Sequence, residues 1–577
     1  MRAMIGSDIL CATLEELGVR HVFGVPGSPN IPLLESLRRS RLQTVINTSE
    51  LEASFAANGY FRASGQTGVL TTIAGPGFTY ALSGIAEARL DSAGILYIVV
   101  GRDDLPGRAF LAQRIDQATM VGPVAKRVYF VNSAEKLRST VAEAFLHARS
   151  GEPGPVMVEV AARALKERAT LGPLSSRREP CPPDAERVEE IVQRLLKAAR
   201  VLLYVGQGTV PAAAELMELA TLLQAPVVTT ISARGVLPED HALCLPLDFQ
   251  GPATPIMNKL VESSDLVLAL GCKMSQIGTH WFGLRIPPEK LIHVDASAET
   301  LGANYPASCA VLADVSGLLK SLLGARSRLE TRHPGWQPAQ IEEARVSSMK
   351  ALESTGPEPM IPGATPTRVS GFFQLLRAYM PRESFLTTDA GLHEVLARRH
   401  FQVLAPRGLI VPSDFQSMGF GVAAAIGAKL ACPDRMSVAL VGDGGLVMSG
   451  MELLTAIREQ LALTVIVFSD GHLGLIRAQQ ISEYGHAYGT RVQCPDWELF
   501  ARSLGAEYAR FDGKAIEAIP TLLGSSGVSI LEVPLGDPAS APGAHLRRRV
   551  SRAAKAFLTT GLVLRSRSAR PSRDSGW

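Results

Sequence analysis

Residues 441–474 read VGDGGLVMSGMELLTAIREQLALTVIVFSDGHLG, and this stretch decides how the last third of the chain folds. Apolar residues at 438–441 and 463–468 predict two buried strands, and the residues between them have helical periodicity. In a right-handed strand–helix–strand unit, both strands end at the same edge of the sheet. We therefore expect Asp443 and Asp470 to lie side by side, in the crevice where open α/β sheets bind ligands.

Glycines surround the first of these carboxylates. Gly442, Gly444 and Gly445 would allow backbone N–H groups to approach a phosphate, and the helix that follows favours an anion. Two hard oxygen ligands beside a phosphate suit Mg²⁺, which binds a few carboxylates together with substrate phosphates. The sequence therefore predicts that Asp443 and Asp470 hold a metal beside a phosphate. The alternative is an ordinary strand–helix–strand unit with a glycine-rich turn.

The same stretch resembles the signature of thiamine diphosphate-dependent enzymes, in which Gly-Asp-Gly is followed, one strand later, by two asparagines. In this chain Ser469 replaces the first asparagine, and Asp470 replaces the second, which ligates the metal in the family. The resemblance implies that Mg²⁺ is held by Asp443, Asp470 and the backbone carbonyl of His472. It also implies that the loop formed by His472, Leu473 and Gly474 contacts the cofactor.

Residues 46–65 resemble the segment that carries the catalytic glutamate of this family. Glu50 stands nine residues before Gly59-Tyr60, the distance found in the family, whereas Glu52 does not. The resemblance implies that Glu50 binds the aminopyrimidine ring of thiamine diphosphate and exchanges a proton with it. Four further segments of this chain resemble other parts of the same family domain. They are HVFGVPGS at 21–28, residues 72–101, FLAQRIDQ at 110–117 and GEPGPVMVEVA at 151–161.

The segment SDFQSMGFGVAAAIGA at 413–428 resembles the part of the family that shapes the cofactor. Met418 matches the large apolar residue that wedges between the two rings, and the carbonyl of Gln416 would accept a hydrogen bond from the exocyclic amine. The segment also contains a GxGxxA pattern beginning at Gly419. No clean hydrophobic strand precedes it, which argues against a dinucleotide turn.

The segment DAGLHE at 389–394 resembles a loop that contacts the diphosphate. The resemblance implies contacts from Gly391 and from the side chain of His393. Leu392 replaces a glutamine often found there, which removes one side-chain contact.

Residues near the expected substrate site separate the reactions of the family. Gln113 occupies the position of a catalytic glutamine in acetohydroxyacid synthases and pyruvate oxidases, and the histidine pair of yeast-type pyruvate decarboxylases is absent. Gln479 stands where those synthases carry a tryptophan that shapes acceptor choice. Ser28 stands where they usually have glycine and where benzoylformate decarboxylase has a catalytic serine. Ser28 would donate a hydrogen bond to the substrate carboxylate, or cap the following helix.

Together these features most resemble the acetolactate synthase large subunit. We expect an enzyme that uses thiamine diphosphate and Mg²⁺ to decarboxylate a 2-oxo acid and transfer the acyl carbanion to a carbonyl acceptor. One alternative is a simple 2-oxo acid decarboxylase of the benzoylformate type. Another is a catalytically silent homologue that binds cofactor or partners. The shared sites of the family imply a homodimer or a homotetramer.

Alternating strand and helix patterns predict an α/β fold of three domains, each with a doubly wound parallel sheet. By resemblance, residues 1–170 form a pyrimidine-binding domain, residues 187–325 a central domain, and residues 367–536 a diphosphate-binding domain. Residues 172–184, rich in Pro and Arg, and residues 326–366, rich in Pro, Gly and Glu, are expected to be linkers.

The central domain leaves its ligand open. It contains Gly206-Gln-Gly208 after a predicted strand, and a turn at Gly271. In the resembling family this domain binds FAD, another nucleotide or nothing. Because Pro211 follows the two glycines, the full dinucleotide fingerprint is missing. FAD is therefore one of three alternatives.

Length and composition fit a globular enzyme. The 577 residues are 46% hydrophobic and 20% charged, and no run of eighteen apolar residues predicts a membrane span. Helical periodicity from residue 5 leaves no room for a signal peptide, and the seven scattered cysteines form no CxxC pair, so we expect a cytoplasmic protein.

Residues 547–577 carry nine Arg or Lys against one Asp, a net charge of +8. We expect this tail, 540–577, to be disordered, with no nucleic acid bound.

Overall fold

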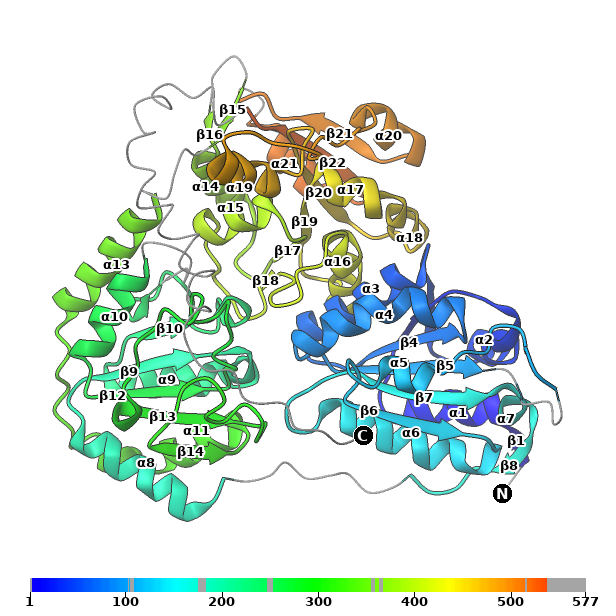
Figure 1. The fold of residues 1–577 in the computed structure, drawn as a ribbon, viewed down its shortest axis with the longest axis horizontal. Coiled ribbons are helices and arrows are strands. Elements are labelled where there is room, and N and C mark those ends of the chain that lie inside the picture. The colour runs from blue at the N-terminus through cyan, green and yellow to red at the C-terminus, as the bar shows by residue number, and fades with distance from the viewer. Residues whose placement is uncertain are drawn as a thin grey trace, which may run out of the picture.

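Three sheets of six parallel strands organise the molecule (Figure 1). The computed structural model describes residues 3–101, 103, 108–174, 183–245, 253–353, 359–362, 367–513 and 516–536. The basic tail lies outside these residues. The N-terminal sheet is blue to cyan in Figure 1, the central sheet is green, and the C-terminal sheet is yellow to orange. The predicted α/β class with three parallel sheets is confirmed.

The N-terminal sheet has the order β3-β2-β4-β5-β7-β6. Its near-continuous apolar strands are those expected of a sheet covered on both faces. The strands are β2 (His21–Gly24), β3 (Gln43–Ile46), β4 (Gly68–Ile73), β5 (Ile95–Gly101), β6 (Arg127–Val131) and β7 (Val156–Ala161). The helices are α1 (Gly6–Glu16), α2 (Ile31–Arg39), α3 (Glu50–Ser64), α4 (Pro76–Leu90), α5 (Gln117–Val121), α6 (Ala134–Arg149) and α7 (Ala162–Lys166), and β1 (Ala3–Ile5) pairs with β8 (Arg168–Thr170).

The C-terminal sheet has the order β18-β17-β19-β20-β22-β21. Counted along the chain, both this sheet and the N-terminal one read 2-1-3-4-6-5, although no sequence repeat links them. The strands are β17 (Phe385–Thr388), β18 (Leu409–Ile410), β19 (Ser437–Gly442), β20 (Leu463–Ser469), β21 (Glu507–Arg510) and β22 (Val528–Pro534). The helices are α14 (Val369–Tyr379), α15 (Leu392–His400), α16 (Phe420–Ala431), α17 (Asp443–Ser449), η5 (Gly450–Glu452), α18 (Leu453–Arg458), α19 (Gly474–Tyr484), α20 (Trp497–Leu504) and α21 (Ala518–Leu523).

The central sheet has a different order, β11-β10-β9-β12-β13-β14, which reads 3-2-1-4-5-6 along the chain. This is the strand order of dinucleotide-binding α/β folds. The strands are β9 (Val201–Val205), β10 (Val227–Thr229), β11 (Cys244–Leu245), β12 (Leu266–Leu270), β13 (Leu291–Asp295) and β14 (Cys309–Leu312). The helices are α8 (Ala185–Lys197), α9 (Ala213–Leu223), α10 (Ala253–Ser263), α11 (Val315–Gly324), α12 (Arg326–Leu329) and α13 (Pro338–Glu353), with short turns η2 (Gln207–Ala212), η3 (Ile231–Ala233) and η4 (Pro288–Lys290).

The segment 326–366, predicted to be a linker, contains the helices α12 and α13. Ile341 on α13 and Trp336 before it are buried with Met257 of α10 in one cluster. A polar composition with few apolar residues suggested a linker, but those few residues lie where the helix packs on the central unit. The remaining strands, β15 (Met360–Ile361) and β16 (Thr367–Arg368), pair with each other.

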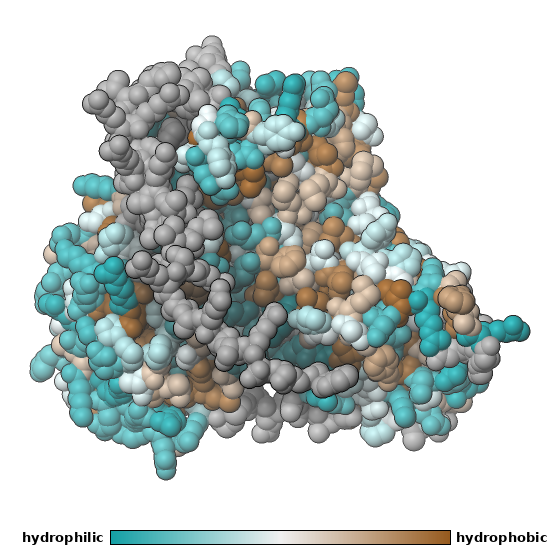
Figure 2. Space-filling view, viewed as in Figure 1, coloured by the Kyte–Doolittle hydropathy of each residue, from teal (hydrophilic) through white to brown (hydrophobic). Residues whose placement is uncertain are grey.

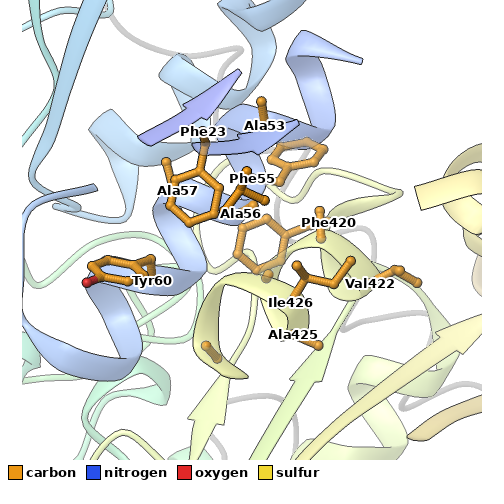
Figure 3. Packing of buried hydrophobic residues seen from close by; sticks show 14 of the residues in the cluster. Phe23, Ala53, Phe55, Ala56, Ala57, Tyr60, Phe420, Val422, Ala425 and Ile426 are labelled. Carbon is orange, nitrogen blue, oxygen red and sulfur yellow. The ribbon is translucent and has the colours of Figure 1, made fainter. Parts of the chain in front are cut away.

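Helices α3 and α16 join the N-terminal and C-terminal sheets (Figure 3). Phe55 of α3 and Phe420 of α16 meet edge to face, with ring centroids 5.3 Å apart. Further along the pair, a Cβ on Gly427 would lie 1.9 Å from the carbonyl oxygen of Ala56. The small residues of both helices therefore permit the backbones to touch, and one core runs through both sheets.

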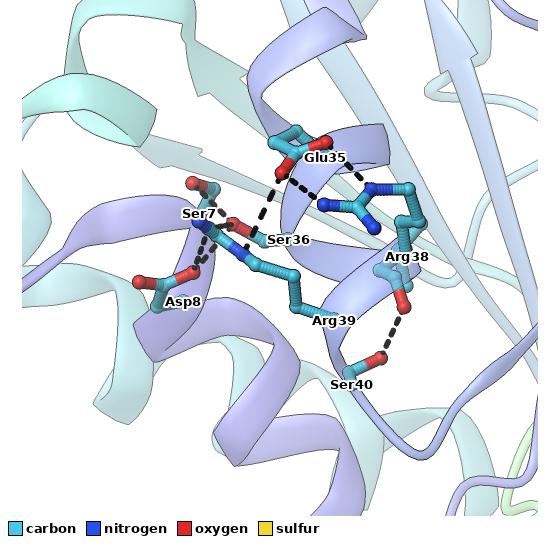
Figure 4. A network of polar contacts seen from close by, with 8 residues as sticks. Ser7, Asp8, Glu35, Ser36, Arg38, Arg39 and Ser40 are labelled. Atoms are coloured by element: carbon cyan, nitrogen blue, oxygen red, sulfur yellow. Dashed lines mark hydrogen bonds and ion pairs between the residues drawn. The ribbon is translucent and has the colours of Figure 1, made fainter.

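On the far side of the N-terminal sheet, polar contacts join α1 to α2 (Figure 4). The Ser36 hydroxyl donates to Asp8 Oδ1 at 2.6 Å, and Arg39 donates to the same oxygen at 2.9 Å.

Among the described residues, no helix has both the length and the apolar composition needed to cross a membrane.

Candidate active site

The turn between β4 and α4 is the centre of one group of predicted site residues. A Cβ on Gly77 would lie 2.9 Å from Oε1 of Glu50, the first residue of α3. A Cβ on Gly75 would lie 2.9 Å from the Cβ of Gln113. Glu50 and Gln113, which are far apart in the sequence, therefore both lie against the start of α4, at the carboxyl edge of the N-terminal sheet.

Ser28 lies at the same edge. A Cβ on the preceding Gly27 would lie 2.5 Å from Cγ2 of Ile73, the last residue of β4. Ser28 is the exposed first residue of a short turn, η1 (Ser28–Asn30), which is capped by a hydrogen bond from the Gly27 N–H to Asn30 Oδ1 at 2.8 Å. The helix-capping alternative for Ser28 is therefore wrong, and its contact with a substrate carboxylate stays a prediction.

A group of buried carboxyl groups lies beside this turn, between the two sheets. Burial raises the pKa of Glu52 well above its usual value, and the carboxylates of Glu452 and Asp389 raise it further. Burial also raises the pKa of Asp389 to about 7, although the Gly421 N–H donates to its Oδ1 at 2.5 Å. No sequence motif connects these groups, because only the packing of α3 on the C-terminal sheet brings them together.

Asp443 and Asp470 lie side by side, as their positions at two strand ends predict. Asp443 is fully buried at the start of α17, and its Oδ2 accepts the backbone N–H groups of Asp470 at 2.7 Å and Gly471 at 2.6 Å. Burial raises the pKa of Asp470, an effect that the His472 N–H opposes and the Asp443 carboxylate reinforces. The pair therefore presents hard oxygen donors at the carboxyl edge of the C-terminal sheet.

Met418 and Leu473 meet over the Gly-Asp-Gly turn. A Cβ on Gly444 would lie 3.0 Å from Met418 Cε and 2.8 Å from Leu473 Cδ2. Gln416 has a left-handed backbone conformation, with φ of 64°, in the loop that leads to α16. The apolar side chain predicted to bend the cofactor therefore stands beside the predicted phosphate cradle. The contacts of Met418 and of the Gln416 carbonyl with a cofactor stay predictions.

His393 on α15 is buried against the same turn. A Cβ on Gly442 would lie 3.0 Å from His393 Nδ1, and one on Gly391 would lie 2.7 Å from Cε1. Burial lowers the pKa of His393 to about 4, and its Nε2 has no hydrogen-bond partner among the described residues. A diphosphate would supply such a partner, and its negative charge would favour the doubly protonated ring. Gly445, the third glycine of this turn, lies against Asp389 and not against His393, since a Cβ on Gly445 would lie 1.6 Å from Asp389 Oδ2.

The loop after Asp470 is held by its own backbone. The Leu473 N–H donates to the Thr490 carbonyl at 2.7 Å, and Nδ1 of His472 lies 2.7 Å from the Asp470 carbonyl oxygen. The His472 ring therefore turns back onto its own loop, so a metal contact would have to come from its backbone carbonyl. Gly474 follows, where a Cβ would lie 2.7 Å from Asp470 Oδ2.

These donors fit Mg²⁺ and a diphosphate. Within the part of the chain that the structure describes, no three His, Cys, Asp or Glu side chains gather to form a metal cage. Mg²⁺ does not need one, because it is usually held by one or two carboxylates, substrate phosphates and water. Asp443 and Asp470 would supply the carboxylates, and the unpartnered Nε2 of His393 suits the phosphate.

Within one chain, hydrogen bonds attach the segment before Glu50 partway along the helical run that begins at Asp443. Just before Glu50, Asn47 and Thr48 donate hydrogen bonds to the Glu452 carboxylate at 2.5–2.9 Å. Glu452 follows Asp443 by nine residues along α17 and η5, which is about 13 Å at 1.5 Å per residue. The segment before Glu50 therefore lies beside Glu452, nine residues along the helical run from Asp443.

Two further hydrogen bonds at the predicted site join residues that no sequence motif connects. Trp497, at the start of α20, donates its indole N–H to Asp443 Oδ1 at 3.2 Å. Glu87 of α4 accepts the backbone N–H of Ser417, the residue directly before Met418, at 3.0 Å. Burial raises the pKa of Glu87 to about 8. The two pairs are separated by 54 and 330 residues, so no local pattern could reveal them.

A separate cavity of about 660 Å³ lies at the carboxyl edge of the central sheet. It is lined by Gly208 after β9, by Gly271 and Lys273 after β12, and by Asp295 at the end of β13. Strand order reverses between β9 and β12, and ligands of open α/β sheets bind at such points. Both glycine turns singled out in the sequence therefore face one cavity.

Comparison with known protein families covers all three sheets. Residues 4–120 match the N-terminal TPP binding domain of thiamine pyrophosphate enzymes, residues 188–322 match their central domain, and residues 389–533 match their C-terminal TPP binding domain. Each of the three sheets falls largely within one of these matches.

Curated relatives agree over most of the chain. Acetolactate synthase of Arabidopsis thaliana chloroplasts is 31% identical over 557 residues, covering 92% of this chain and 81% of the relative. Isozyme 1 large subunit of Escherichia coli acetolactate synthase is 30% identical, covering 82% and 83%. A probable acetolactate synthase large subunit of Methanocaldococcus jannaschii is 28% identical, covering 88% and 87%. The chain belongs to the thiamine pyrophosphate enzymes. Within that family it is an acetolactate synthase-like enzyme that depends on thiamine diphosphate.

Proposed function

We propose that this enzyme uses Mg²⁺ with its cofactor to decarboxylate a 2-oxo acid and transfer the acyl carbanion to a carbonyl acceptor. The observation that carries the proposal is that Gln113 and Glu50 lie against two glycines, Gly75 and Gly77, at the start of α4. By resemblance, a glutamine at this position belongs to the synthases and oxidases of the family. The names of the curated relatives, all acetolactate synthases, support the same reaction.

The residues of the two sheets would divide the work. When bound, thiamine diphosphate supplies carbanion chemistry through its thiazolium ring. Glu50 would bind the pyrimidine ring and hold or release a proton at its carboxylate. Asp443 and Asp470 would bind Mg²⁺, His393 would bind the diphosphate, and Met418 would support the rings and keep water away.

Product analysis tests this proposal. The protein is incubated with thiamine diphosphate, Mg²⁺ and a panel of 2-oxo acids, with and without aldehyde acceptors. Carboligation releases CO₂ and yields an acyloin or a hydroxylated oxo acid. Free aldehyde as the main product would instead support a benzoylformate-type decarboxylase, which the exposed Ser28 at the same edge favours. Absence of CO₂ release from every oxo acid would indicate a catalytically silent homologue.

We also propose that the working unit is a homodimer or a dimer of dimers, so that each site combines two chains. The separation of Glu50 from Asp443 within one chain supports this arrangement. Apolar side chains are exposed along the helical run that begins at Asp443 and on α4, and Figure 2 shows hydrophobic residues gathered where the N-terminal and C-terminal sheets meet. The exposed residues are Tyr80 on α4, Val447 and Met448 on α17, Met451 on η5 and Leu454 on α18. A symmetric partner would bury this surface.

FAD in the central cavity is the third part of the proposal. The strand order and the close approach of Gly208 to Gly271, where a Cβ would lie 2.9 Å from the Gly271 Cα, suit a dinucleotide. The second strand, β10, ends at Thr229, where NAD-binding folds carry an acidic residue for the ribose. Flavin absorbance after denaturation of the purified protein would support FAD, and a colourless protein that also fails to bind added FAD would contradict it.

The cytoplasmic location stays a prediction. The six cysteines of the described residues are all free.

A further inference from the structure

The carboxylate of Asp443 is almost fully used by the protein itself. Its Oδ2 accepts two backbone N–H groups, from Asp470 and Gly471, which fill the two lone-pair positions of that oxygen. Its Oδ1 accepts one hydrogen bond, from the indole of Trp497 at 3.2 Å. The thiol of Cys494 lies beside the same carboxylate, which together with burial raises the pKa of the thiol, and its Sγ also lies 3.7 Å from the Val492 carbonyl oxygen. Oδ1 therefore accepts one N–H group where Oδ2 accepts two, so Oδ1 is the oxygen more open to a ligand.

The position of Trp497 is itself well determined. Trp497 is 4% exposed, and its ring packs edge to face on Phe500 with centroids 5.7 Å apart. Asp496, directly before it, caps α20 by accepting the Leu499 N–H at 2.9 Å. This buried ring, with its one donor on Oδ1, therefore acts together with the two backbone N–H groups on Oδ2 to orient the Asp443 carboxylate.

We propose that Trp497 is a positioning residue for the metal site, whose indole N–H turns the free lone pair of Asp443 Oδ1 toward Mg²⁺. This inference rests on the proposed function, because it assumes that Asp443 ligates Mg²⁺. Hydrogen bonds to metal-ligating carboxylates orient them, and their loss typically lowers metal affinity about 10–100-fold. Because the indole and the metal share one oxygen, the fluorescence of Trp497 should also report metal binding.

The first test measures Mg²⁺ affinity by calorimetry, with thiamine diphosphate in excess. Trp497→Phe keeps the aromatic packing and removes only the donor, so its dissociation constant should rise about 10–100-fold. The matched control is Trp336→Phe, since Trp336 is also 4% exposed and donates its indole N–H, at 2.9 Å, to the Val201 carbonyl of the central sheet. The control should bind Mg²⁺ like the wild type. Equal affinity in folded Trp497→Phe and wild type would overturn the inference. If the wild type binds no Mg²⁺, the proposed function fails instead.

The second test does not depend on the folding of Trp497→Phe. Addition of Mg²⁺ to the wild type with thiamine diphosphate should change the tryptophan emission. The change should persist in the three single variants that keep Trp497, which are Trp281→Phe, Trp336→Phe and Trp577→Phe. Loss of the change in one of them, or its absence in a wild type that binds Mg²⁺ by calorimetry, would show that Trp497 does not sense the metal.

Discussion

Thr48 donates two hydrogen bonds to the carboxylate of Glu452, from its backbone N–H at 2.9 Å and from its hydroxyl at 2.5 Å. This pair attaches the segment before Glu50 to η5, nine residues along the helical run that starts at Asp443. Because those nine residues span about 13 Å at 1.5 Å per residue, this contact sets the predicted acid–base residue apart from the predicted metal ligands within one chain.

Glu50→Gln should lower turnover at least about 100-fold while thiamine diphosphate still binds, because losing a positioned acid–base group typically costs 10²–10⁴. The matched control is Glu52→Gln, two residues further along the same helix. Glu52 is buried with a raised pKa, so an amide resembles its neutral form, and turnover should stay near the wild-type rate. Steady-state rates with calorimetric cofactor binding check both. Wild-type turnover in Glu50→Gln would remove it from the chemistry.

Asp443→Ala should abolish the Mg²⁺-dependent retention of thiamine diphosphate, since it removes the buried carboxylate at the centre of the predicted metal site. Asp470→Asn is the control, because it restores the amide of the resembling family and should retain Mg²⁺. Cofactor affinity with and without Mg²⁺ is the measurement. Unchanged Mg²⁺ dependence in Asp443→Ala would place the metal elsewhere.

Gly427→Ala should destabilise the protein by about 1–3 kcal/mol or more, the usual cost of overpacking a core. The new Cβ would lie 1.9 Å from the Ala56 carbonyl oxygen, and backbone on both sides resists movement. Gly324→Ala, at the end of α11, introduces a Cβ into open space and should be neutral or slightly stabilising. Denaturant unfolding of both variants compares them, and equal stabilities would argue against the close packing of α16 on α3.

The sequence predicted the strands and the contact between Asp443 and Asp470 because both follow from local patterns. Apolar runs mark the strands, and parallel strand–helix–strand units place consecutive strand ends at one edge. Glu50, Gln113 and Ser28 were assigned by motif, and the structure places all three around the end of β4.

Other features have no local signal. The shared strand order of the outer sheets depends on strand pairing, which hydrophobic patterns do not encode. Glu452 reaches Asn47 across 405 residues, and Trp497 reaches Asp443 across 54. The segment that contains α13 was predicted to be a linker. Ile341 is buried, but this residue alone does not make a periodic apolar pattern from which the helix could be recognised.

Asp389 should make stability depend on pH. Its pKa is raised by burial from 3.8 to about 7 in the folded protein, so the folded state holds a proton that the unfolded state loses. Stability from this group is therefore complete below pH 3.8 and declines as pH rises toward 7. Asp389→Asn, which keeps an acceptor for the Gly421 N–H, removes this dependence. Melting temperatures of the cofactor-free proteins from pH 4 to 8 should show the wild type falling relative to the variant. Parallel curves would contradict the buried, protonated Asp389.

Subunit complementation tests whether each active site combines Glu50 and Asp443 from two chains. Inactive Glu50→Gln and inactive Asp443→Ala chains are mixed under conditions in which labelled subunits are shown to exchange. If each site takes Glu50 from one chain and Asp443 from another, a mixed dimer contains one site with both residues intact, and part of the activity should return. An active monomer in sedimentation, or no recovery of activity despite proven exchange, would contradict the shared site.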